Sequence, residues 1–168
     1  MFEKFTRKAR EAVLTAVVEA EKDRSPKVTE QHLLLALLTS DLLADSSVTR
    51  DMVRYAYRSV ERQAGLTDAD AAALEELGID LDEVVRRVEN AHGENVLADR
   101  RGRRRRHTPF APDAKQVLTG ALREGRELND RTLGAEHILL AMSARGEVAA
   151  QLLAANGLGY RELRAKAS

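Results

Sequence analysis

The residues best suited to chemistry are the four histidines, because an imidazole can bind a metal or transfer a proton near neutral pH. His32 and His137 each precede an apolar run, LLLALL and ILLAM respectively. Their equivalent places favour a structural role at the start of a helix. His92 and His107 have no cysteine, histidine or carboxylate at the spacing of a zinc site. Since no Ser-His-Asp motif is present either, we expect no catalytic residue, no metal site and no enzyme.

The strongest local charge is a run of arginines, which would attract phosphate groups with an affinity that falls steeply with salt. No aromatic residue interleaves with the run, so it does not predict a stacking platform for single strands. A solvated linker and a contact with an acidic protein surface are the alternatives to nucleic-acid binding. The run consists of Arg100, Arg101, Arg103, Arg104, Arg105 and Arg106.

Nucleotide and thiol chemistry are not predicted. A phosphate-binding loop needs the pattern G-x-x-x-x-G-K-[ST], and the sequence has no Gly-Lys pair. The absence of cysteine excludes disulfides and thiolates. No apolar run approaches the roughly 18 residues that span a bilayer, and no signal peptide is recognisable. The absence of cysteine leaves a reducing cytoplasm as the expected location, and we expect no cofactor. With 27 basic and 27 acidic side chains in balance, the whole molecule has no net field to steer a charged partner.

The elements that must position these residues are predicted to be helices that occur twice. Phe5–Leu38 and Phe110–Ser143 superpose without a gap at a constant offset of 105. Each copy begins with a helix that has an apolar stripe at helical spacing, followed by a buried apolar helix. The later segments Leu77–Val84 and Asn156–Leu163 also match, at an offset of 79. An internal duplication of this kind predicts two similar structural units.

The fold class expected from this duplication is all-α, a tandem pseudo-twofold pair of four-helix repeats with an extra helix inserted in the first. The first repeat is assigned to residues 1–92, with the insertion at about 41–66, and the second to residues 108–168. Residues 93–107 form the arginine-rich linker. The inserted helix is predicted at Val48–Ala64, as an addition to the surface. Because neither repeat can bury its apolar faces alone, the two are expected to form one compact domain.

Three stretches resemble a known family, the Clp N-terminal (Clp R) repeat domain of the ClpC, ClpA and ClpB unfoldases. They are MFEKFTRKAREAV at the start, HTPFAPDAKQVL at the opening of the second half, and GAEHILLAM followed by EVAAQLL. The likeness covers nearly the whole chain and is nearest to the ClpC type of actinobacteria. Unfoldases of this family carry their ATPase modules after this domain. The insertion and the divergent linker favour a stand-alone homologue over the front of a longer unfoldase.

The resemblance implies a binding surface for peptides, adaptors and, in actinobacterial members, cyclic peptides. The matching positions are Phe2, Leu14, His107, Phe110 and Lys115. Phe2 has the profile of an aromatic anchor at a chain end, although it could equally be a hydrophobic staple on the first helix.

Some ClpC-like domains also bind phosphorylated arginine, with one site in each repeat. A glutamate before the histidine holds the guanidinium group, and a threonine at the start of the first helix helps to hold the phosphate. The first copy keeps Thr6 but has Gln31 in place of the glutamate, and the second keeps Glu136 but has Ala111 in place of the threonine. A neutral amide cannot replace the charge-assisted pair, so each copy is expected to have lost half of its site.

The function expected from these observations is protein or peptide binding. The module would dock substrates, adaptors or cyclic peptides, and would modulate or mimic a Clp unfoldase without an ATPase of its own. The alternative is a nucleic-acid-associated protein that uses the arginine run.

Overall fold

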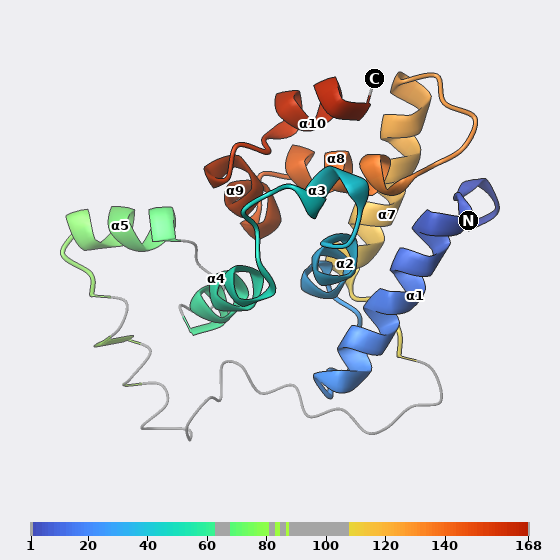
Figure 1. Ribbon diagram of the computed structural model, residues 1–168. Helices are drawn as coiled ribbons and strands as arrows, with labels where there is room; N and C mark the ends of the chain where they lie inside the picture. Colours follow the sequence, from blue (N-terminus) through green and yellow to red (C-terminus); the bar gives the residue numbers. More distant parts are fainter. Residues whose placement is uncertain (1, 63–67, 81–82, 85–86, 88–107, 168) are drawn as a thin grey trace.

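The computed structural model describes all residues except 1, 63–67, 81–82, 85–86, 88–107 and 168. The described residues form helices joined by short loops, and no strand occurs among them; two isolated backbone bridges are the only sheet-like pairing there. In chain order the helices are η1 (Phe2–Lys4), α1 (Arg7–Lys22), α2 (Glu30–Leu37), α3 (Asp41–Ala44), α4 (Arg50–Arg62), α5 (Asp68–Glu76), α7 (Pro112–Glu127), α8 (Ala135–Ala144), α9 (Val148–Ala155) and α10 (Tyr160–Ala167) (Figure 1). The prediction of an all-α fold is confirmed.

The first helices of the two repeats, α1 and α7, end in the same way. Arg24 and Asn129, which occupy equivalent positions, both have positive φ, at 53° and 58°. After each of them the chain closes the helix with one backbone bond, from Ser25 N–H to the Ala20 oxygen (2.9 Å) and from Asp130 N–H to the Gly125 oxygen (2.8 Å). Such left-handed residues satisfy carbonyls at the end of a helix. The offset of 105 therefore extends from the sequence to backbone geometry.

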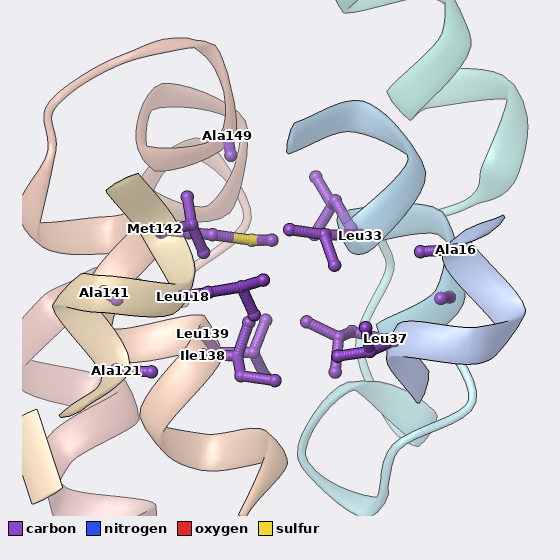
Figure 2. Packing of buried hydrophobic residues seen from close by; sticks show 14 of the residues in the cluster. Ala16, Leu33, Leu37, Leu118, Ala121, Ile138, Leu139, Ala141, Met142 and Ala149 are labelled. Carbon is purple, nitrogen blue, oxygen red and sulfur yellow. The ribbon is translucent and has the colours of Figure 1, made fainter. Parts of the chain in front are cut away.

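The core lies between the two short apolar helices, α2 and α8. Leu33 and Leu37 of α2 face Leu118 of α7, and Ile138 and Met142 of α8 (Figure 2). Each of these side chains is at most 2% exposed, and burying one contributes about 1.5–3 kcal/mol. Both helices are apolar nearly all round because they are surrounded by other helices. Neither repeat could cover its central helix alone.

A reciprocal exchange of backbone bonds joins the two repeats. In the first repeat, the residues before α1 pair with Leu133: Thr6 N–H donates to the Leu133 oxygen and Leu133 N–H to the Lys4 oxygen, both at 2.8 Å. In the second repeat, the residues before α7 pair with Val28 in the same way: Val28 N–H donates to the Pro109 oxygen and Ala111 N–H to the Val28 oxygen, again at 2.8 Å. Val28 and Leu133 are equivalent in the duplication, so the exchange obeys the predicted pseudo-twofold symmetry. It also brings the start of each first helix beside the second helix of the other repeat.

The packing of α4 corrects the predicted location of the extra helix. Along α3–α4 and α9–α10, three buried positions correspond at an offset of 110. They are Leu43 and Leu153, Val48 and Leu158, and Val53 and Leu163. Moreover, α4 packs against α2 and α9. It is therefore the fourth helix of the first repeat, and neither a surface addition nor an insertion at 41–66.

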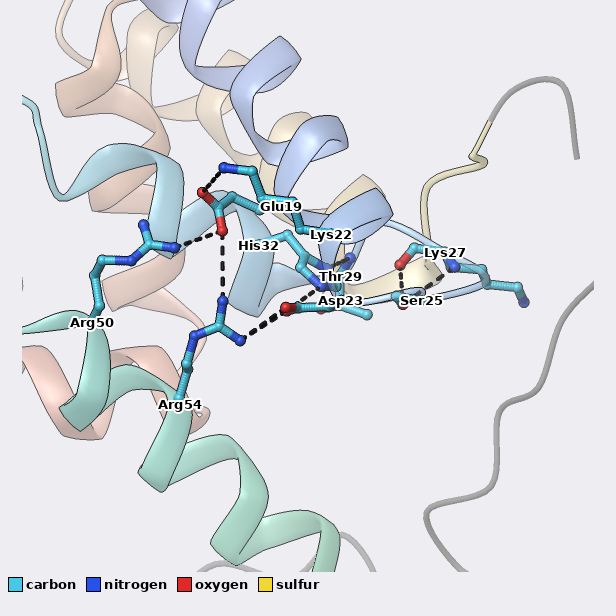
Figure 3. Close-up of polar contacts among 9 residues, drawn as sticks. All are labelled: Glu19, Lys22, Asp23, Ser25, Lys27, Thr29, His32, Arg50 and Arg54. Atoms are coloured by element: carbon cyan, nitrogen blue, oxygen red, sulfur yellow. Dashed lines mark hydrogen bonds and ion pairs between the residues drawn. The ribbon is translucent and has the colours of Figure 1, made fainter. Parts of the chain in front are cut away.

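A carboxylate at an equivalent place in each repeat ties the fourth helix to the first. Glu19 of α1 is 4% exposed, and its Oε2 accepts a hydrogen bond from Arg50 Nη2 of α4 at 2.6 Å (Figure 3). In the second repeat, Glu124 of α7 accepts from the Tyr160 hydroxyl of α10 at 2.7 Å. Arg50 and Tyr160 are related by the same offset of 110 as the buried positions of α3–α4 and α9–α10. The correspondence of α4 with α10 thus holds for polar as well as apolar side chains.

The helix that the first repeat has in addition is α5. Figure 1 shows it apart from α1, α2 and α7, and its described side chains include exposed Ala72 and Ala73. The chain leaves α5 through Gly78, whose φ of +80° is typical of a residue that ends a helix. Asp80 Oδ1 then accepts a hydrogen bond from the Glu83 N–H at 3.2 Å, as a residue that caps the start of a helix does.

The division into residues 1–92, 93–107 and 108–168 stays a prediction.

In the described part of the chain, no single helix is long and apolar enough to cross a bilayer; only α8 and α9 together meet that test, as a pair bent by 103°.

Candidate functional site

The two equivalent histidines have the same structural task, as predicted. Each accepts, at Nδ1, a hydrogen bond of 3.0 Å from the backbone N–H of the residue before its helix, Thr29 for His32 and Gly134 for His137. Each directs Nε2 at an aspartate on the preceding loop, at 3.5 Å from Asp23 Oδ2 and at 3.0 Å from Asp130 Oδ2. Both imidazoles are buried. They cap α2 and α8 from within, and no group that could hold a metal ion is found among the described residues.

The charge around the two imidazoles differs. Burial lowers the pKa of His32 more than the Asp23 carboxylate raises it. The pKa of His137 is raised, chiefly because the Glu136 carboxylate lies 3.2 Å from its Nδ1, with a smaller effect from Asp130. In return, the proximity of the His137 ring lowers the pKa of Glu136. Glu136 is therefore ionised at neutral pH.

A cleft of about 610 Å³ lies where the start of α1 meets the start of α8. Because of the backbone exchange, its walls come from both repeats: α1, the end of α2 and the start of α3 from the first, and the start of α8 from the second. The lining residues are Thr6, Arg7, Lys8, Glu11, Ala12, Thr15, Ala36, Leu37, Thr39, Ser40, Asp41, Leu42, Gly134, Ala135 and Glu136.

The cleft holds separated groups of both charges. Glu136 supplies a carboxylate at the start of α8, whereas Arg7 and Lys8 supply cations in the first turn of α1. Both cations are in exposed ion pairs, Arg7 Nε with Glu11 Oε1 at 3.0 Å and Lys8 Nζ with Asp41 Oδ2 at 3.3 Å, which water screens and which a ligand can replace at little cost. The Ser40 hydroxyl oxygen is buried without a hydrogen-bond partner. This arrangement suits a ligand that carries a cation and an anion close together.

The structure pairs the predicted phosphoarginine residues differently from the sequence. Thr6 was expected to act with Gln31, and Glu136 with Ala111, each pair inside one repeat. The exchange instead places Thr6 and Glu136, from different repeats, in the same cleft. The threonine kept by the first copy and the glutamate kept by the second therefore line one cleft. The Thr6 hydroxyl oxygen also accepts from Ala9 N–H at 3.2 Å and caps α1.

Two of the predicted peptide-binding residues, Leu14 and Lys115, are exposed on the first helices of the two repeats. Leu14 of α1 is 65% exposed, and Lys115 of α7 is exposed. Phe110 is half-buried against the core and pairs with Val28, which favours a structural role for its ring. Phe2 lies in η1. The surface defined by these residues stays a prediction.

Two predictions fall on residues outside the description. They concern His107 in the peptide-binding surface and the arginine run at 100–106.

Comparison with known proteins decides the family. The model of the Clp repeat (R) N-terminal domain matches residues 63–156, more than half of the chain. The chain belongs to this family. Within it, the rice (Oryza sativa subsp. japonica) chaperone protein ClpC1, chloroplastic, is 30% identical over 165 residues, which are 98% of this chain and 15% of that protein. A homolog of ClpA, the ATP-binding subunit of the ATP-dependent Clp protease, from Cyanidium caldarium is 30% identical over 167 residues, 98% of this chain and 16% of that protein.

The fold of the family is present over the whole chain. The N-terminal domain of ClpD, a caseinolytic protease associated chaperone from Arabidopsis thaliana, superposes with a TM-score of 0.59 at 23% identity and covers 99% of this chain and 96% of that one. The chain spans about 15% of the length of the ClpC relative from rice. Clp N-terminal domains are non-catalytic binding modules. The special likeness to actinobacterial ClpC stays a prediction.

Proposed function

We propose that the chain binds peptides or proteins for a Clp unfoldase, and that its principal site is the cleft between α1 and α8. The observation that carries the proposal is the meeting of Thr6 and Glu136, from different repeats, in one cleft. Substrates, adaptors and cyclic peptides are the proposed classes of partner, in the cytoplasm. The chain acts by recognition and has no ATPase of its own.

The ligand proposed for the cleft is a phosphorylated arginine side chain in a substrate protein. Its guanidinium group would pair with the ionised Glu136, and its phosphate with the cations and N–H groups at the start of α1, where the helix dipole also favours an anion. The family resemblance supports this ligand, and the charges of the cleft fit it. The equivalent pair, Gln31 and Ala111, offers neither the carboxylate nor the hydroxyl.

The test is calorimetric titration with a peptide that contains one phosphoarginine and with the same peptide carrying plain arginine. The phosphorylated peptide should bind at one equivalent per chain. Glu136→Gln should weaken binding at least tenfold, which corresponds to about 1.4 kcal/mol, because the amide keeps the shape but loses the charge.

The matched control is Gln31→Ala, at the equivalent position of the first repeat, which should leave binding unchanged. Equal affinity for the two peptides, or loss of binding in Gln31→Ala but not in Glu136→Gln, would refute the proposed site. Circular dichroism of each variant separates loss of binding from loss of fold.

A further inference from the structure

The second half of the molecule has a counterpart of the open cleft, and side chains of the chain itself occupy it. Under the offset of 105, the cleft residues Glu11, Ser40 and Ala135 correspond to Gln116, Arg145 and Glu30. In the open cleft these three positions line the cavity, and Glu11 pairs with Arg7 of its own helix. In the counterpart, the Arg145 side chain contacts both Gln116 and Glu30.

Arg145, at the end of α8, is the centre of that group. Its Nη1 donates to Gln116 Oε1, and its Nη2 donates to Glu147 Oε1 at 2.7 Å. Its Nε lies 3.5 Å from Glu30 Oε1. The side chain of Arg145 is 15% exposed. A guanidinium group is thus held by three acceptors from α7, α2 and the residue before α9.

Glu30 is the acceptor least satisfied by this arrangement. The residue is 2% exposed, and its Oε2 accepts from the Tyr57 hydroxyl at 2.6 Å. Its Oε1 faces Arg145 Nε without a hydrogen bond, and both atoms are buried. Burial raises the pKa of Glu30, which agrees with a carboxylate that lacks a full partner. A buried ion pair of imperfect geometry does not recover the desolvation cost of its charges.

We propose that this counterpart is a guanidinium-binding site occupied by the chain's own Arg145, so that each chain offers one open cleft instead of two. The ligand class is a planar guanidinium cation, which matches the fork of acceptors that surrounds it. In the open cleft, Ser40 stands where Arg145 stands in the counterpart, and its short side chain leaves the space free. The guanidinium-binding site is inferred from geometry alone. Only the statement that each chain offers one open cleft rests on the proposed function.

The experiment is chemical rescue of Arg145→Ser, the residue found at the equivalent position of the first repeat. The variant should melt below the wild type because Glu30 loses its cation. Millimolar guanidinium chloride should then raise its Tm saturably and recover about half of the loss, since a ligand that binds only the folded state stabilises it. Sodium chloride at equal ionic strength should not do so, and the Tm of the wild type should not rise.

The double variant Glu30→Gln/Arg145→Ser is the control, because it removes the carboxylate that would hold the added guanidinium. If Arg145→Ser responds identically to guanidinium and sodium, or if the double variant is rescued equally well, the proposal is overturned. Rescue is measured without any peptide, so its failure is distinct from failure of phosphoarginine binding.

A second measurement serves if Arg145→Ser does not fold. In the wild type, the Arg145 Nε–H signal in nuclear magnetic resonance should exchange with water at least tenfold more slowly than that of exposed Arg7. Equal exchange rates would overturn the proposal, because an occupant held in its site is shielded from solvent.

Discussion

The boundary between α7 and the following loop offers a quantitative test of the duplication. Gly125 of α7 is buried, and a Cβ built on it would overlap Leu133 Cδ2. At the equivalent positions, the first repeat has Ala20 and Val28, both 0% exposed. Each repeat therefore combines one smaller and one larger residue in the same space. The pair Gly125–Leu133 and the pair Ala20–Val28 are expected to be alternative solutions of equal volume.

Gly125→Ala should consequently be destabilising by up to about 2 kcal/mol. Alanine gains roughly 1 kcal/mol in a helix relative to glycine, but overpacking at Leu133 costs about 1–3 kcal/mol. Leu133→Val alone should cost about 1 kcal/mol through the lost methylene and the space left behind. The double variant recreates the residues of the first repeat, so the overlap disappears and the helical gain remains.

The assay is urea unfolding of the wild type, both single variants and the double variant. The two substitutions should couple favourably by about 1–3 kcal/mol, whereas independent substitutions add within about 0.5 kcal/mol. Ala20→Gly is the control in the first repeat, and it should only destabilise because no overlap exists there to relieve. Additive free energies of unfolding in the cycle would refute the reasoning.

Two further predictions concern equivalent positions. Arg24 has a left-handed backbone, which is more costly for an arginine than for an asparagine. Arg24→Asn should therefore stabilise the fold by about 1 kcal/mol, and Asn129→Arg should destabilise it similarly. Unchanged urea midpoints for both variants would contradict this. His32 has a lowered folded pKa, so its contribution to stability is present above the unfolded value of about 6.5 and is lost as the pH falls. His137 has a raised folded pKa, so its contribution is present below that value and is lost as the pH rises. When the pH falls from about 7.5 to 5.5, the free energy of unfolding should decrease less in His32→Gln than in the wild type, and more in His137→Gln. Changes of the same sign in both variants would contradict the assigned pKa directions.

The sequence was sufficient to predict the all-α fold, the duplication and the role of the histidines, because these depend on periodicity and on spacing along one chain. The apolar runs after His32 and His137 indicated buried central helices, and both are buried. These features depend on residues that are close together in the sequence, so a local sequence pattern is sufficient to predict them.

The sequence was not sufficient to identify which helix is additional or how the site is composed. The match of Leu77–Val84 to Asn156–Leu163 depended on Gly78 and Gly157, whereas the true counterpart of α10 begins at Arg50, and Ser47 stands where the second repeat has Gly157. The pairing of Thr6 with Glu136 depends on backbone bonds between distant segments, which leave no signal in the spacing. The cleft at α1 and α8 was therefore found only by its geometry.

The reciprocal backbone exchange has a consequence for the ancestry of the chain. Each repeat both gives and receives the same bonds, so the surface that one repeat presents to the other is self-complementary. A polypeptide with the second repeat alone would carry both halves of this surface and could associate with a copy of itself about a true twofold axis, as isologous dimers do. Gene fusion of such a dimer would produce the present arrangement. Once fused, the two halves were free to diverge, and one cleft could remain open while the other acquired an arginine to fill it.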